Sequence, residues 1–251
     1  MHTPAMKLRR KGWGARWRPK SKTFWQKKVA HTDDKTFAYQ TSQEARRKAR
    51  SMRKTHMYRS GDEGLYFAVP DKLKHRQGNT AVHVTAVIAN GRVRKFEYYD
   101  GNMNGALYAH ICDTVLAPVL GELSDELGGE VPYLLRDCAP QRGTKALSGE
   151  GRLAEQRAGI KPIEQAGDSP DTQVCDYWFW HDLNERMARQ EEAWEEQHPG
   201  EEFNETLPQF KTRLRRTALR TSKRSIDKAT GSMKRRCVEL AEGDGGWLTG
   251  D

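Results

Sequence analysis

The chain has 251 residues, an apolar fraction of 36% and a net charge of +9. Average globular proteins are ~45–50% apolar, so we expect a core together with long solvated stretches. No segment approaches the ~18 apolar residues of a membrane span, and the charged N-terminal segment lacks the apolar stretch of a signal peptide. The excess of basic residues favours an anionic partner, with nucleic acid as the first candidate.

The four cysteines argue against a zinc site or a disulfide framework, because none of them forms a CxxC pair. They are Cys112, Cys138, Cys175 and Cys237. Free thiols are typical of a reducing compartment, either the cytosol or the nucleus.

Residues 1–30 contain ten lysines and arginines and no acid, with three tryptophans interleaved. The basic residues include Arg9, Arg10 and Lys11. Lysine and arginine bind phosphates, and indoles either stack on bases or pack onto a neighbouring domain. The segment is therefore a DNA-contacting arm, a nuclear-import signal or a disordered basic leader.

A weak strand is expected at residues 29–32, followed by Asp33 and Asp34. Phe37 and Tyr39 then alternate, as in a second strand or a continuation of the first. Residues 41–60 form a second basic patch that includes Arg46 and Arg47.

The most strand-like segment is 80–89, which is rich in β-branched residues. Asn90 and Gly91 predict a hairpin turn, with residues 93–99 as the returning strand. Residues 104–123 have the apolar periodicity of a helix, which Pro118 must kink or interrupt.

A short buried strand is expected at residues 133–135, with Asp137 where the strand ends before Pro140. Further on, the sequence predicts a short strand at 160–163 and an aromatic-rich helix at 174–197, with Asp176 in its first turn. A long basic helical region covers 203–240; it contains Arg215 and Arg216 and is divided by Gly231. The glycine-rich tail, 241–251, is expected to be flexible.

Three acids stand out because each follows a strand or begins a helix: Asp33, Asp137 and Asp176. In a ribonuclease H-like layout, the first strand lies beside the strand that ends at Asp137, and a helix brings Asp176 to the same edge. Clustered carboxylates repel one another unless a cation neutralises them, and hard oxygen ligands suit Mg²⁺ or Mn²⁺. Two such ions support in-line displacement at a phosphodiester.

Five motifs resemble those of the DDE transposases of the mariner superfamily, in the order in which that family has them. Residues 32–37 (TDDKTF) resemble its first acid motif, 136–140 (RDCAP) its Asp-Asn-Ala-Pro motif, and 169–176 (SPDTQVCD) the motif that ends in its third acid. Residues 82–91 (VHVTAVIANG) and 232–236 (SMKRR) are similar to a strand pair and a late motif of the family. Cys138 replaces the usual Asn, and Gln173 and Val174 change the entry to the helix.

The resemblance implies an α/β, ribonuclease H-like fold, with a mixed five-stranded sheet flanked by helices. It implies DNA cleavage and strand transfer, with Asp33, Asp137 and Asp176 as ligands of two Mg²⁺ or Mn²⁺ ions; Asp34 and Asp171 remain alternatives. The implied partners are transposon-end and target DNA, with a homodimer allowed and neither a membrane nor a small-molecule substrate expected. The implied location is the nucleus. Backbone contacts to DNA are expected from Arg9, Arg10, Lys11, Arg46, Arg47, Arg215 and Arg216.

Domain boundaries follow from the same resemblance. We expect a basic leader at 1–27, the catalytic domain at 28–240 and the tail at 241–251. Members of the family usually have a paired helix-turn-helix region before the first acid, so a catalytic domain without that region is expected here. The main alternative is an inactive, transposase-derived protein that only binds DNA; a structural packaging protein is a more distant one.

Overall fold

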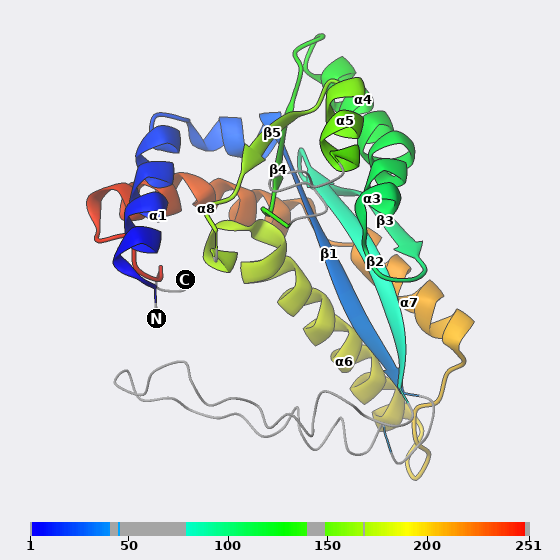
Figure 1. The fold of residues 1–251 in the computed structure, drawn as a ribbon. Helices are drawn as coiled ribbons and strands as arrows, with labels where there is room; N and C mark the ends of the chain where they lie inside the picture. Colours follow the sequence, from blue (N-terminus) through cyan, green and yellow to red (C-terminus); the bar gives the residue numbers. More distant parts are fainter. Residues whose placement is uncertain (1, 41–44, 46–78, 140–148, 168, 249–251) are drawn as a thin grey trace.

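A five-stranded mixed sheet forms the centre of the computed structural model, which describes residues 2–40, 45, 79–139, 149–167 and 169–248 (Figure 1). The strands are β1 (Val29–Gln40), β2 (Asn79–Ala89), β3 (Arg92–Tyr99), β4 (Tyr133–Arg136) and β5 (Lys161–Glu164). Their order is β3-β2-β1-β4-β5. β1, β2 and β3 pair antiparallel, whereas β4 and β5 run parallel to β1. The expected mixed five-stranded sheet is thus confirmed.

The hairpin between β2 and β3 is also confirmed. Asn90 and Gly91 both have positive φ, 46° and 75°. Two successive residues with positive φ define the turn that matches the twist of a tight hairpin, and Asn-Gly is the dipeptide that adopts it most readily.

One face of the sheet is covered by a helical layer between residues 105 and 157. It consists of α3 (Gly105–Ile111), the π-helical turn η3 (Cys112–Leu116), α4 (Ala117–Glu126) and α5 (Glu150–Arg157). The predicted helix is therefore confirmed, and its regular hydrogen bonding is interrupted at η3, just before Pro118. A π-turn at this point is a usual way for a helix to accommodate an irregularity.

Within the described residues, the segment Gly105–Glu126 is the one helix with the length and composition to cross a membrane. Its apolar side chains, among them Ile111, Leu116 and Leu123, pack against Ala30, Val87 and Leu134 of the sheet. This packing is that of a helix covering a core.

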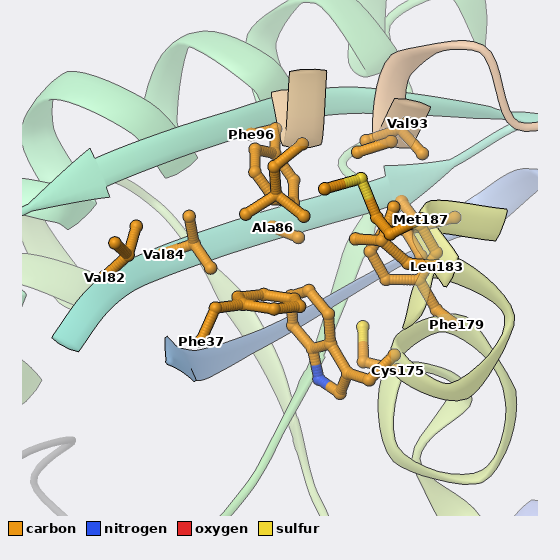
Figure 2. Packing of buried hydrophobic residues seen from close by; sticks show 14 of the residues in the cluster. Phe37, Val82, Val84, Ala86, Val93, Phe96, Cys175, Phe179, Leu183 and Met187 are labelled. Carbon is orange, nitrogen blue, oxygen red and sulfur yellow. The ribbon is translucent and has the colours of Figure 1, made fainter. Parts of the chain in front are cut away.

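The other face is covered by elements from both ends of the chain. They are α1 (Pro4–Trp17), η1 (Phe24–Lys28), the short turns η5 (Pro170–Thr172) and η6 (Cys175–Phe179), α6 (Trp180–Gln197), α7 (Leu207–Leu219) and α8 (Lys223–Glu242). Figure 2 shows Phe37 of β1 and Val84 of β2 packed with Phe179 and Leu183, the latter from α6. None of the four cysteines forms a disulfide.

The N-terminal segment is not a separate leader. Trp13, Trp17 and Trp25 are buried in one cluster with Val29 of β1 and Leu240 of α8. Figure 1 shows α1 in blue alongside α8. Between the two uses proposed for these indoles, stacking on bases and packing, the structure shows packing.

Two further expectations about the C-terminal part are wrong. Gly231 does not divide the basic helical region, because it lies inside the continuous α8; the break falls at residues 220–222, where Ser222 caps α8 through its side chain. The tail is held as far as Leu248: Arg10 donates to the carbonyls of Gly245 and Gly246, at 2.8 Å each. The same arginine therefore fixes both ends of the chain.

Candidate active site

The relative position of Asp33 and Asp137 follows from the pairing of β1 with β4. Ala30 is aligned with Leu134 and His31 with Leu135. Continuing this register by two residues places Asp33 opposite Asp137, just beyond the last residue of β4. Neighbouring strands are ~4.8 Å apart, so the backbone brings the two acids side by side.

Asp33 does not follow its strand, as the sequence had suggested, but lies within it. β1 continues to Gln40 because β2 keeps pairing with it, from His31 opposite Ile88 to Gln40 opposite Asn79. β4 has only four residues and stops at Arg136. Asp33 is therefore at the point where β1 loses its neighbour on one side.

Side-chain alternation separates Asp33 from Asp34. Asp33 is 8% exposed, and its Oδ2 accepts a hydrogen bond of 2.7 Å from Trp180 Nε1 on α6. Asp34 accepts a hydrogen bond from Thr85 and, as the next residue in the strand, points to the opposite face. Asp34 thus lies away from the face that α6 covers.

Asp137 and Asp176 line the same hollow, which we call the carboxylate hollow. Glu164 at the end of β5 and Gln165 just after it also line this hollow, and Arg9 and Arg16 of α1 form part of its wall. Asp176 is exposed in the π-helical turn that precedes α6, as expected for an acid in a first helical turn. Irregular π-turns are frequent at functional sites.

Several contacts fix the turn that carries Asp176. Gln173 Nε2 donates to the Thr32 carbonyl at 3.1 Å, which ties the turn to β1 next to Asp33. The Tyr177 hydroxyl donates to the Ala229 carbonyl at 2.6 Å, and Arg236 lies over the Tyr177 ring at 3.8 Å. Burial raises the pKa of Tyr177 to about 12, so the hydroxyl remains a donor at neutral pH.

Cys138 also makes a structural contact. Its Sγ donates to the Gln165 carbonyl at 3.0 Å and so connects the ends of β4 and β5. Asp137 Oδ1 accepts from the backbone N–H of Ala139 at 3.2 Å, which fixes that carboxylate within its turn.

The three carboxylates do not form a closed cluster. Among the residues that the structure describes, no group of three or more His, Cys, Asp or Glu side chains is arranged to hold a metal ion. The expectation that all three face one point is therefore not met: Trp180 holds Asp33, whereas Asp137 and Asp176 face the hollow. The donor types nevertheless fit a hard divalent cation, because Asp33, Asp137 and Asp176 all supply carboxylate oxygens.

Asp171, an alternative for the third acid, has a structural role. Arg10 donates to its two carboxylate oxygens at 2.8 and 2.6 Å, and the backbone N–H of Leu248 donates at 2.9 Å. Arg10 is fully buried in this pair. Arg10 is therefore not the DNA-contacting surface residue that the sequence suggested, because its charge is already matched inside the protein.

The other basic candidates lie in three places. Arg9 and Lys11 are exposed on α1, and Arg9 lines the carboxylate hollow. Arg215 and Arg216 are exposed on α7, where Arg215 approaches Glu97 at 3.6 Å. Arg46 and Arg47 lie outside the described residues.

Three contributors were not identified from the sequence: Trp180, Arg136 and His31. Trp180 follows Asp176 by four residues, so a helical-spacing argument could have placed it beside the acids. Arg136 is buried against Glu155, with Nη2 to Oε2 at 2.9 Å, and anchors the strand before Asp137 to α5. Burial lowers the pKa of His31 to about 4, so a neutral imidazole lies two residues before Asp33.

Comparison with solved structures identifies the fold. The catalytic domain of Mos1 mariner transposase superposes with a TM-score of 0.67 at 14% sequence identity, covering 99% of this chain and 98% of that one. The same domain with raltegravir and Mn gives a TM-score of 0.68 at 13% identity and 99% coverage of both chains. A pre-cleavage Mos1 transpososome gives 0.70 at 15% identity, where this chain spans 65% of the transposase chain.

Comparisons of sequence alone find nothing comparable. No protein-family model matches the chain, and no curated protein matches it. At 13–16% identity, the structural match establishes the fold but not the activity. The chain has the α/β, ribonuclease H-like fold of a mariner transposase catalytic domain.

Proposed function

We propose that this chain is a metal-dependent DNA endonuclease and strand transferase of the DDE type. Asp33, Asp137 and Asp176 would hold two Mg²⁺ or Mn²⁺ ions. The observation that carries the proposal is the β1–β4 register, which places Asp33 opposite Asp137 on the face where η6 presents Asp176. The neighbouring Mos1 structures include catalytic domains with Mn and with Mg.

The bound ions would activate the attacking oxygen, from water or a DNA 3′-hydroxyl, and stabilise the leaving oxygen. The protein's own contribution is to position the ligands. Trp180 holds one oxygen of Asp33, and the Ala139 N–H holds one oxygen of Asp137. Such supporting contacts orient ligands and commonly matter nearly as much as the ligands themselves.

DNA is the substrate that the wall of the hollow fits best. Arg9 and Arg16 are seven residues apart on α1, so they lie on the same side of that helix, and both line the hollow with the acids. Their guanidinium groups would bind phosphates on either side of the scissile bond. Mos1 neighbours include a paired-end complex with the left transposon end. A nuclear location and a homodimer are parts of the same proposal.

Nicking of supercoiled plasmid with Mg²⁺ or Mn²⁺ tests the activity. The wild type should produce open circles, and Asp137→Asn should produce none above the metal-only background. Asp34→Asn is the matched control, because this acid neighbours Asp33 but faces the other side of the sheet. Equal nicking by wild type and Asp137→Asn would disprove the assignment.

The alternative, a DNA-binding protein without catalytic activity, is favoured by one observation: the described carboxylates do not converge. It makes the opposite prediction in the same assay. DNA binding would persist, whereas no metal would produce nicking in the wild type.

A further inference from the structure

A second hollow, lined mainly by basic residues, lies between the start of η1 and the first turns of α8, and we call it the η1–α8 hollow. It is lined by Lys22, Gln26, Lys223, Arg224, Asp227 and Lys228, together with Gly231 and Ser232. Four of these side chains are cationic and one is acidic. It shares no lining residue with the carboxylate hollow.

Three of the cations are available to a ligand. Lys223 is paired with Asp227, which leaves this pair neutral. Lys22, Arg224 and Lys228 are exposed, and they form no ion pair or hydrogen bond with any residue that the structure describes. Since the acid is already matched, the hollow keeps about three uncompensated positive charges.

The hollow is held in shape by contacts beneath it. Gln26 Nε2 donates to the Asp227 carbonyl at 2.8 Å and ties η1 to α8. Lys22 lies across Gly231, where an added Cβ would come within 2.6 Å of the lysine Cε. A glycine at this position of the helix therefore leaves room for the lysine to cross α8.

We propose that the η1–α8 hollow binds the phosphate backbone of a nucleic acid strand. Arg224 and Lys228 are one helical turn apart, with ~5–6 Å between their Cβ atoms, a separation comparable to that of neighbouring phosphates on one strand. Lys22 adds a third charge from the opposite wall. Among the described residues, only charged, polar and glycine residues line the hollow, so it recognises charge and not base sequence.

This inference extends the proposed function: a DNA held at the η1–α8 hollow would be a different segment from the one cleaved at the carboxylate hollow. It rests on the proposed function only in taking DNA as the ligand. Binding can be measured without metal and without cleavage, so a failure of the catalytic proposal leaves it standing.

The test measures the affinity for a short random-sequence DNA duplex. Fluorescence anisotropy gives the binding constant at salt concentrations from 50 to 200 mM, without divalent metal. The variant is the triple change Lys22→Ala, Arg224→Ala and Lys228→Ala. Each phosphate contact contributes ~0.9 to the slope of log K against log salt, so the slope should become shallower by about 2–3. The control removes the same charge elsewhere, from Lys95, Arg152 and Lys161, and should change the slope by less than about 1.

Two results would overturn the proposal. Equal losses in both triple variants would mean that only net charge matters. A polyglutamate peptide that binds the wild type as tightly as the duplex, and loses its binding in the hollow variant, would assign the hollow to an acidic protein. Circular dichroism melts of both variants establish that the comparison is made between folded proteins.

Discussion

Replacing Asp171 by Asn tests whether this acid is a structural partner or a metal ligand. In the structure, Asp171 accepts two hydrogen bonds from the buried Arg10 and one from the Leu248 N–H. The amide of Asn presents one oxygen and one NH₂ group to these three donors. At least one donor must then face another donor, and the charge of Arg10 loses its partner.

The expected cost is several kcal/mol of folding free energy. Breaking a buried ion pair by removing one partner typically costs ~3–5 kcal/mol, because the remaining charge stays buried. Arg10 keeps the carbonyls of Gly245 and Gly246, which favours the lower end, about 3 kcal/mol. For a domain of this size, each kcal/mol lowers Tm by ~2–4 °C, so we expect a decrease of about 6–12 °C.

Thermal melting by circular dichroism without divalent metal measures this effect. Asp244→Asn is the matched control, because Lys7–Asp244 also joins α1 to the tail but is solvent-exposed; this variant should melt close to wild type. In a double-mutant cycle, Arg10→Met should add little cost once Asp171 is changed. A wild-type Tm for Asp171→Asn would refute the structural role and make Asp171 a candidate ligand again.

Three further predictions concern the site. Trp180→Phe removes the indole donor to Asp33 and should lower Mg²⁺ affinity or nicking by ~10–100-fold, with little loss of secondary structure. Metal titration and plasmid nicking measure these effects, and unchanged values would mean that this hydrogen bond does not position the acid. Mg²⁺ at 100 times its Kd should stabilise the wild type by about 2.7 kcal/mol, which corresponds to a Tm increase of about 5–10 °C. Asp137→Asn should show no such increase and should be at least as stable as the wild type without metal. An equal Tm increase in this variant would contradict the assignment of Asp137 as a metal ligand. The pKa of His31 is about 4 in the folded chain and 6.5 in the unfolded chain, so the unfolded state binds more protons between these pH values. The free energy of unfolding should therefore fall by about 3 kcal/mol as the pH decreases from 6.5 to 4. Denaturant titrations should show a smaller decrease over that window in His31→Leu, and parallel curves for the two proteins would rule His31 out as the cause.

Local sequence determined the elements of this fold. The β-branched run before Asn90-Gly91 specified a hairpin, because that dipeptide readily adopts positive φ at both positions. The apolar periodicity around Leu116 and Leu123 specified a helix, and the short apolar run before Asp137 specified a buried strand. The ribonuclease H-like layout that the mariner resemblance implies predicted that the first strand lies beside the strand that ends at Asp137, and the pairing of β1 with β4 confirms it.

Only the tertiary structure decided how the charged residues are used. Arg9, Arg10 and Lys11 are consecutive basic residues, yet one lines the carboxylate hollow, one is buried against Asp171, and one faces outward. Asp33 and Asp34 also differ in use, because successive side chains of β1 point to opposite faces of the sheet. The early end of β4 then leaves Asp33 beside Asp137. Local propensity is insensitive to these choices, because Arg10, Asp33 and Asp34 find their partners on elements that are remote in sequence. These partners are Asp171, Trp180 and Thr85. The physical reason is that burial and pairing of charge are properties of the packed chain, whereas helix and strand formation depend on neighbours in sequence.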